Sequence, residues 1–301
     1  MSVAQSGVFT KHLDRDVTDI FFNNYSQYET QYDKIARVRS AYPGGHYTQA
    51  ELSGMGALQE KPEGNPITFD SPVEGNEVTR YYTVFALGFQ ITFEMINDDL
   101  FGNFKRMPAE LGKSAAYKRE TEFFDLFNNG FATHTAWDGN YIFMSDTRTI
   151  LKDGTAGNFN EPASGTALSL TSLEVALNYG ATARDSAGRP IMMKPRLLLI
   201  PPALKWTTKE LLLSEFTPEG TGNSINAVQG EGLQYMVSPH LTDTAAWFVL
   251  YDNHDFQFHW KNKPSIVPND DFHTINRLYR VFMRFATFCN NPTGVYGNPG
   301  A

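Results

Sequence analysis

The chain has 301 residues, 41% of them hydrophobic, and carries a formal net charge of −8 with no run of basic residues. The length and apolar content predict a folded protein with a sizeable core. Specific nucleic-acid binding is disfavoured as the main task, because it usually needs a clustered positive surface. The single cysteine, Cys289, cannot form an intramolecular disulfide, so we expect stability to come from packing or assembly in a reducing compartment. The sequence shows neither a secretory signal nor an apolar run that could span a bilayer, and we expect a soluble chain with no membrane partner.

Residues 14–38 alternate charged and aromatic side chains. This pattern predicts one or two short helices, with Asp14 or Asp16 as N-cap. We interpret this part of the chain as an arm that lies on a surface.

A Gly- and Pro-rich segment follows from Pro43 to Asn76, and ten of its 34 residues are Gly or Pro. It sustains neither a helical nor a strand period, and its composition cannot bury enough apolar surface to hold the segment in place. Folded back as a two-stranded arm it could reach about 50 Å, at about 3.3 Å per residue. We therefore expect it to be ordered only by something outside its own domain, and a second copy of the chain is the favoured receiver.

The next part of the chain predicts a strand, a long helix and a polar connection. Residues 77–95 are rich in β-branched and aromatic side chains, which favours a strand. A long amphipathic helix is predicted from Pro108 to Asn129, because Pro suits the first helical turn. Residues 138–165 are polar and Gly-rich, and we expect a hairpin within them at 141–151.

The remaining elements alternate in type. Thr171 and Glu174 have the spacing of a capping box and predict a helix start, and a second helix is predicted over 203–213. Apolar runs predict strands, of which the first reads as fully buried; they cover 196–200, 232–238, 246–252, 255–261 and 275–289. Helices and strands interspersed in this way predict an α+β chain.

The best candidate for chemistry is the group His254, Asp255 and His259, since two His and a carboxylate can hold a divalent metal. The odd spacing of the two histidines would place them on opposite faces of a strand, which favours surface or interface histidines instead. The acidic pairs Asp98–Asp99 and Asp270–Asp271 are typical of turns. No nucleophile elbow or phosphate-binding loop is present in the sequence, and we expect neither catalysis nor a cofactor.

Several passages, taken in order, resemble the major capsid (head) proteins of tailed bacteriophages. They are GNEVTRYYTVFALGFQITFEMINDDLFG, AAYKRETEFFDLFNNGF, LSLTSLEVAL, KPRLLLIPPAL and the ending KPSIVPNDDFHTINRLYRVFMRFATFCNNPTGVYG. The resemblance runs from about residue 20 to 297. It implies the Hong Kong-type shell fold.

For this chain the resemblance implies five parts. They are an N-terminal arm at 1–42, an extended loop at 43–90, a peripheral domain with a long spine helix at 91–189, an axial domain at 190–252, and a return to the peripheral domain at 253–301. Apart from the resemblance, we expect charged side chains to contribute inter-subunit contacts, namely Glu60, Lys61, Glu63, Arg80, Lys113, Arg119, Glu120, Asp270 and Asp271.

The function implied is that of a structural protein that self-assembles as hexamers and pentamers into an icosahedral head. The shell would enclose double-stranded DNA without sequence preference, and the acidic balance of the chain suits such a container. Expected partners are further copies of the chain, a portal, and a separate scaffold or decoration protein; the expected location is the virion, after assembly in the host bacterial cytoplasm. Two alternatives stay open: an encapsulin-like nanocompartment shell, and a metal-dependent β-rich enzyme built on His254 and His259.

Overall fold

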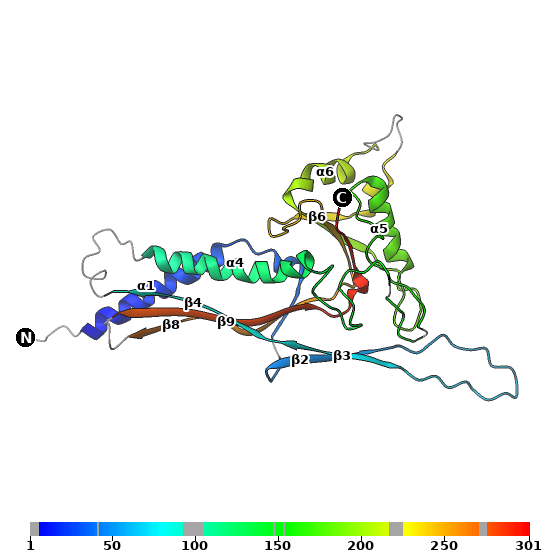
Figure 1. Ribbon diagram of the computed structural model, residues 1–301, viewed down its shortest axis with the longest axis horizontal. Helices are drawn as coiled ribbons and strands as arrows, with labels where there is room; N and C mark the ends of the chain where they lie inside the picture. Colours follow the sequence, from blue (N-terminus) through cyan, green and yellow to red (C-terminus); the bar gives the residue numbers. More distant parts are fainter. Residues whose placement is uncertain are drawn as a thin grey trace, which may run out of the picture. The chain divides into compact units, whose positions relative to one another are not determined.

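The computed structural model describes residues 6–40, 42–92, 105–146, 148–152, 154–216, 225–270 and 276–301 (Figure 1). The chain divides into two compact units. Unit 1 comprises Met1–Tyr47, Arg80–Phe123 and Phe258–Thr287, and unit 2 comprises Thr48–Thr79, Phe124–Gln257 and Phe288–Ala301. The mixture of helices and strands confirms the α+β class.

Unit 1 is built on a four-stranded sheet in the order β1-β8-β9-β4. Its strands are β1 (Arg37–Ser40), β8 (Phe256–Asp270), β9 (Arg277–Cys289) and β4 (Thr83–Ile91). β4 and β9 are antiparallel, with Thr83 opposite Phe285 and Ile91 opposite Arg277. β1 and β4 are the edges of this sheet.

The described residues of unit 1 include the helices α1 (Ser6–Gln27), the short α2 (Tyr32–Ile35) and most of α4 (Arg106–Asn128). Phe21 of α1, Leu111 of α4 and Val281 of β9 share one core cluster, so both long helices pack against the sheet. Gly112 permits this approach, because a Cβ at that position would lie 2.6 Å from the backbone oxygen of Phe21. The predicted long helix is confirmed and begins two residues before Pro108.

The predicted N-caps of the first helix are wrong. α1 already begins at Ser6, and both Asp14 and Asp16 lie inside it. Asp14 instead accepts hydrogen bonds from Arg277 Nε at 3.2 Å and from the Tyr279 hydroxyl at 2.8 Å. A partner so distant in sequence leaves no local signal, so an acidic residue inside the helix imitated a helix start.

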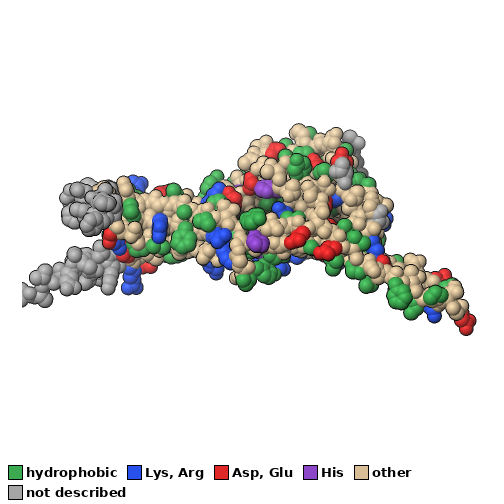
Figure 2. Space-filling view, turned by 60° about the horizontal axis from the view of Figure 1, so that its bottom comes forward, with side chains coloured by type: hydrophobic (Ala, Val, Ile, Leu, Met, Phe, Trp, Pro, Cys, Tyr) green, Lys and Arg blue, Asp and Glu red, His purple; other side chains and the backbone are tan. Residues whose placement is uncertain are grey.

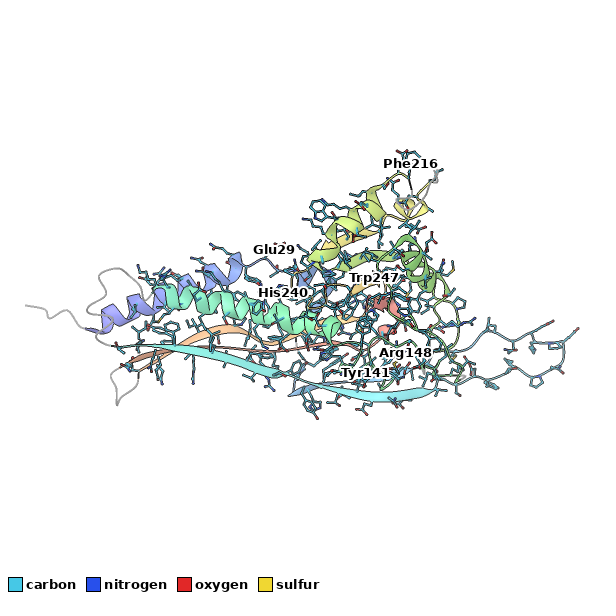
Figure 3. All side chains as sticks on the ribbon, turned by 45° about the horizontal axis from the view of Figure 1, so that its top comes forward. Glu29, Tyr141, Arg148, Phe216, His240 and Trp247 are labelled. Atoms are coloured by element: carbon cyan, nitrogen blue, oxygen red, sulfur yellow. The ribbon has the colours of Figure 1, made fainter. Side chains whose placement is uncertain are left out.

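Unit 2 contains a second four-stranded sheet in the order β10-β7-β5-β6, in which β5 and β6 are parallel and β7 is antiparallel to both of its neighbours. The strands of this sheet and the helices that accompany them in the chain are α5 (Leu170–Thr182), β5 (Pro195–Ile200), η2 (Pro202–Leu204), α6 (Lys205–Leu213), η3 (Ala227–Glu231), β6 (Gln234–Val237), β7 (Trp247–Tyr251), η4 (Pro292–Gly294) and β10 (Val295–Asn298). Every residue of β7 is buried. Trp247 and Phe216 are labelled in Figure 3; Trp247 lies in the core of this unit and Phe216 follows α6.

Two local predictions in unit 2 are corrected. The capping box at the start of α5 is formed by Ser169 and Ser172, so the helix begins before Thr171. Among the described residues of 141–151 there is no strand pair, and Tyr141 and Thr149 instead form isolated bridges with Thr135 and Ala156. The buried Arg148 organises this segment, since its Nη1 donates to Asn160 Oδ1 at 2.9 Å and its Nη2 donates to the backbone oxygen of Tyr141 (Figure 3). A Gly-rich connection fixed by one arginine has no periodic pattern to predict.

The predicted strand at 77–95 is two strands, β3 (Glu74–Tyr81) and β4, separated at the buried Tyr82. Its last residues and the pair Asp98–Asp99 lie outside the described residues. The strand predicted at 255–261 is confirmed but continues to Asp270 as β8. Within the described part of the chain, no helix combines the length and apolar character that crossing a bilayer requires.

Candidate functional site: the assembly surfaces

The Gly- and Pro-rich segment forms an extended loop, and its part from Thr48 onward belongs to unit 2. β2 (His46–Leu52) pairs with β3, and the hydroxyls of Thr48 and Thr79 lie 3.1 Å apart across the pair. Residues 53–73 then continue without helix or strand, as the long loop of Figure 1 shows. The chain reverses where Asn65 N donates to Pro62 O at 3.2 Å, with Gly64 at a φ of +83° that favours glycine. The predicted two-stranded arm is therefore present, and its outer part has no ladder.

The outer loop exposes large apolar side chains. Leu58 is 102% exposed and Phe69 91%, and Met55 and Ile67 are more than half exposed. Figure 2 shows hydrophobic side chains along the loop and charged ones at its end. Covering a Leu or Phe side chain of this kind contributes about 1.5–3 kcal/mol, so the loop presents a surface suited to a partner.

The base of the loop is held by the chain's own unit 2. Ser53 N donates to Val73 O at 2.8 Å and Ser53 Oγ accepts from Val73 N at 2.7 Å, which closes the ribbon. Asp70 accepts from Gly56 N at 2.7 Å and forms an ion pair with Lys152. The expectation that the whole segment needs an outside receiver is thus wrong for its base, and only residues 57–69 project beyond these anchors.

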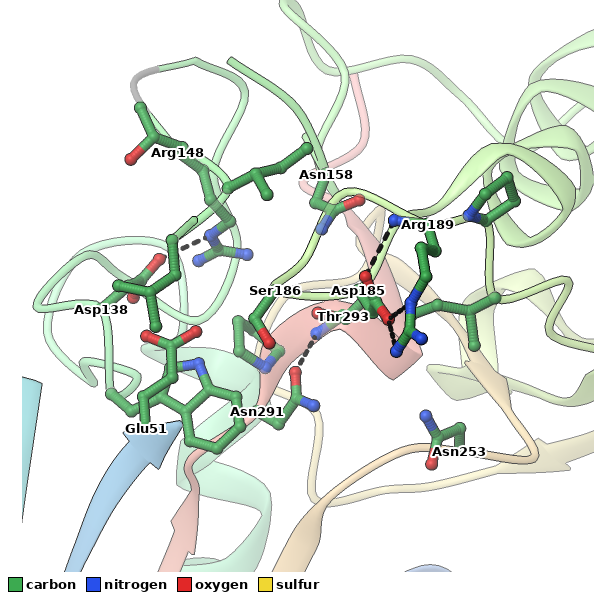
Figure 4. A pocket seen from close by; sticks show the side chains of 17 residues that line it. Glu51, Asp138, Arg148, Asn158, Asp185, Ser186, Arg189, Asn253, Asn291 and Thr293 are labelled. Carbon is green, nitrogen blue, oxygen red and sulfur yellow. Dashed lines mark hydrogen bonds and ion pairs between the residues drawn. The ribbon is translucent and has the colours of Figure 1, made fainter. Parts of the chain in front are cut away.

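A polar cavity of about 580 Å³ lies beside the loop base within unit 2 (Figure 4). Glu51 of β2 is only 9% exposed and faces this cavity near Asp138 and Arg148, which are joined by a 2.8 Å contact. Burial, with repulsion from Asp138, raises the pKa of Glu51 to about 6, and Arg148 opposes this rise. The charge of Glu51, near the end of β2, therefore changes in a pH range where an exposed glutamate is already ionised.

One face of unit 1 carries a groove between β4 and α4, which we name the β4 groove. Its volume is about 400 Å³, and its lining includes Val84, Leu87, Leu111 and Tyr117. Val84, Leu87 and Tyr117 are each more than half exposed. Lys118 at its side is engaged by Glu122, so the β4 groove is mainly apolar.

A second groove of unit 1, which we name the aromatic groove, has a volume of about 550 Å³. Its lining combines aromatic and apolar side chains with two cationic ones, and consists of Phe22, Tyr25, Tyr32, Val38, Arg39, Ser40, Trp260, Lys263 and Pro264. Phe22 and Val38 are 40% and 45% exposed. Arg39 and Lys263 are both exposed, and neither belongs to an ion pair among the described residues.

The predicted contact residues differ in their exposure. The exposed ones, which stay predictions, are Glu60, Lys61 and Glu63 near the loop apex, Lys113, and Asp270, which pairs with Arg277. Arg80 is half-buried, and Asp271 lies outside the described residues.

Arg119 and Glu120 are not surface contacts, because both are buried. Glu120 Oε2 accepts from the backbone N–H of Gln31 and of Tyr32 at 3.2 and 3.0 Å, and the Arg119 guanidinium lies 4.4 Å from the ring centroid of Tyr25. They fasten the N-terminal elements to α4 and form the support beneath the aromatic groove. Two adjacent charged residues in a predicted helix are normally expected to be solvent-exposed, which explains why the sequence prediction was wrong.

The histidines predicted at a surface or interface are both buried, so that prediction is wrong. The ring of His259 lies 5.0 Å from that of Tyr47 and 6.1 Å from that of Tyr42, and burial lowers its pKa to about 4. Asp255 accepts from Gln257 Nε2 at 2.7 Å and from Asn291 N at 3.3 Å, a structural use. No cluster of three or more His, Cys, Asp or Glu side chains suited to a metal occurs among the residues that the structure describes.

A sheet carrying a long helix, a second α/β unit and a projecting loop define a shell-forming subunit of the Hong Kong type. A family model described as phage capsid protein matches residues 78–298. The chain belongs to this phage capsid protein family, and it is a structural protein of the capsid shell. No curated protein sequence matches the chain.

Solved structures support the same fold at low sequence identity. The capsid of the cyanophage P-SCSP1u is 12% identical with a TM-score of 0.60, covering 89% of this chain and 87% of that one. The capsid of Myoviridae phage XM1 is 12% identical with a TM-score of 0.53, covering 92% and 95%. A virus-like particle from Pyrococcus furiosus is 9% identical with a TM-score of 0.53, covering 94% and 98%.

Proposed function

We propose that copies of this chain pack as pentamers and hexamers into an icosahedral phage head that encloses double-stranded DNA. The observation that carries this proposal is the anchored loop with an uncovered apolar tip, since Leu58 and Phe69 are almost fully exposed. A monomer gains nothing from such a tip, whereas a neighbouring subunit that covers it removes apolar surface from water.

The charge of the chain supports an enclosing role. With a formal charge of −8 and no basic run, the subunit offers little attraction to phosphate. A container that must admit and release its genome benefits from weak attraction to DNA. We propose that the chain acts without catalysis, and that a portal and a separate scaffold or decoration protein complete the head in the host cytoplasm.

We also propose the part assignments implied by the family. Residues 190–252 would form the axial domain around the pentamer and hexamer centres, and α4 would be the spine helix of the peripheral domain. Exposed apolar side chains on α6 fit this placement, because Trp206 is 67% exposed and Leu213 63%.

The test of the proposed function is the assembly of purified protein, followed by light scattering and negative-stain imaging. Closed particles of megadalton mass are expected, and a stable monomer or dimer at high concentration would overturn the proposal. Replacing both Leu58 and Phe69 with Ser should lower particle yield more than tenfold, because about 1.5–3 kcal/mol per side chain is lost at every contact. The exposed Gln59→Ala is the matched control on the same loop and should assemble normally.

An encapsulin-like compartment with an enzyme cargo has the same fold, and the family match favours the phage head over it. The contents of particles made during infection separate the two. A phage head should contain double-stranded DNA that is protected from nuclease. Particles that hold protein cargo and no nucleic acid would support the alternative.

A further inference from the structure

The loop apex combines two kinds of chemistry that a receiving surface must match. Leu58 supplies an uncovered apolar side chain, and Glu60 and Glu63, close after it in sequence, supply two carboxylates. All three are exposed and lie at or just before the turn at Pro62–Asn65, where the exposed Lys61 is the one cation against two carboxylates within 57–69. A partner that suits the apex therefore needs an apolar floor with cations at its rim.

The two grooves of unit 1 differ in this respect. The β4 groove is apolar, and Lys118 at its side already pairs with Glu122. The aromatic groove has Phe22 and Val38 as partly exposed apolar walls, and Arg39 and Lys263 as rim cations that no described carboxylate neutralises. Charge complementarity thus favours the aromatic groove for the acidic apex.

We propose that the loop apex of one copy docks in the aromatic groove of a second copy, with Leu58 against Phe22 and Val38 and with Glu60 and Glu63 facing Arg39 and Lys263. This inference rests on the proposed shell function, because it names the surface that receives the loop. The apolar contact provides most of the affinity, and the rim charges mainly set orientation and the rate of association.

The groove is already shaped in the isolated subunit. Tyr25 and Tyr32 form its wall, and the Arg119 guanidinium lies 4.4 and 5.4 Å from their ring centroids. Glu120 fixes the chain at Tyr32 through its backbone N–H at 3.0 Å. A receptor that needs no rearrangement loses less free energy on docking than a mobile one.

The decisive experiment is disulfide trapping in assembled particles. Cys289 is buried and does not compete, so Leu58→Cys combined with Val38→Cys should yield covalent multimers under mild oxidation. Leu58→Cys with Val84→Cys tests the β4 groove in the same way, since Val84 is also exposed, and it should stay monomeric on a denaturing gel. Leu58→Cys alone reports contacts between two apices and should also stay monomeric.

Charge reversal provides a second readout. Glu60→Lys with Glu63→Lys, or Arg39→Glu with Lys263→Glu, should slow assembly about tenfold at low salt and much less at high salt, because steering by rim charges is screened. Combining all four changes should restore the rate. Lys61→Glu, which alters the apex charge in the opposite sense, should not slow assembly.

The outcomes separate this inference from the function on which it rests. If wild-type protein forms particles but only the Val84 pair cross-links, or no pair does, the aromatic groove is not the receptor and the shell function stands. Unrestored assembly in the fourfold variant would likewise reject the charge match. If wild-type protein forms no particles at all, the shell function itself fails.

Discussion

Asp14 and Arg277 are 263 residues apart in sequence and form an ion pair, with Arg277 Nη2 2.5 Å from Asp14 Oδ2. Arg277 also pairs with Asp270, and the Tyr279 hydroxyl donates to Asp14 at 2.8 Å. One carboxylate of α1 is therefore held by two side chains of β9. These contacts hold α1 against β9 in the sheet of unit 1.

Replacing Asp14 with Asn should loosen α1 from the sheet. Hydrogen bonds to charged groups contribute about 1.5–3 kcal/mol each, and exposure of the pair reduces this, so we expect a loss of about 1–2 kcal/mol in the free energy of unfolding. Chemical denaturation measures the loss, and hydrogen exchange of the α1 amides should accelerate. Asp16→Asn, at an exposed position of the same helix, is the control. Equal stability of the two variants would contradict the fastening role of Asp14.

A side chain at Gly112 should separate α1 from α4. The Cβ of Gly112→Ala would lie 2.6 Å from Phe21 O and 3.2 Å from Tyr25 N, and backbone atoms cannot retreat without moving the helix. Overpacking of this kind costs about 1–3 kcal/mol, measurable as a lowered midpoint in thermal or denaturant unfolding. Gly230→Ala is the matched control, because its Cβ would meet no atom within 4 Å. Unchanged stability of Gly112→Ala would show that the two helices are not in tight contact.

Glu51 should make stability fall as pH rises. Its pKa is raised from 4.5 to about 6 in the folded state, so the folded chain binds more protons than the unfolded chain between these values. The contribution of Glu51 to the free energy of unfolding is fully present below pH 4.5 and is lost as pH rises through 6. At about 1.4 kcal/mol per pKa unit, the free energy lost is about 2 kcal/mol. Glu51→Gln should remove this dependence and be the more stable protein at pH 7. If the free energy of unfolding depended on pH in the same way for wild type and Glu51→Gln across pH 4–7, the assignment to Glu51 would be wrong.

His259 should act in the opposite direction. Burial lowers its pKa from 6.5 to about 4, so the unfolded chain binds the extra proton first. The contribution of neutral His259 is present above pH 6.5 and is lost as pH falls toward 4, by up to about 3 kcal/mol. His259→Gln should flatten this part of the stability profile, whereas the exposed His46→Gln should leave it unchanged. A profile for His259→Gln that still falls steeply with acid would assign the effect to another group.

The His variants also bear on the metal-dependent alternative. Replacing His254 and His259 with Gln should leave particle assembly close to normal, because neither side chain is exposed to a neighbour. Elemental analysis of purified wild-type protein checks the other side of the argument. Stoichiometric metal that is lost in the double variant would revive a metal site.

The sequence predicted those elements whose pattern is continuous and local. The apolar run of β5, the aromatic strand β9 and the long helix α4 were each found within a few residues. The extended loop was recognised from the abundance of Gly and Pro between two patterned flanks. The shell fold followed from the order of several passages rather than from any single motif.

The failures share one physical cause, which is dependence on partners far along the chain. The sequence predicted Asp14 as a helix cap, whereas in the structure it pairs with Arg277. It predicted Arg119 as a surface charge, whereas in the structure its guanidinium lies against Tyr25 and Tyr32. The aromatic groove was missed for the same reason, because α1, β1 and β8 each contribute only a few of its side chains. The alternation of tyrosines with charged residues in 14–38 was the one available signal.

The anchoring of the loop base by Lys152 and Asp70 has a consequence for how a shell would grow. Fixing a backbone costs about 1–2 kcal/mol per residue in conformational entropy. For β2 and β3 this entropy is lost when the subunit folds, before any contact between subunits forms. Only residues 57–69 are left to be ordered at the moment of contact. The loop of an incoming subunit then has an ordered base and a short adaptable apex. A loop of this kind can bind a neighbouring subunit quickly, and its short apex can still adapt to neighbours that are oriented at different angles in a curved shell.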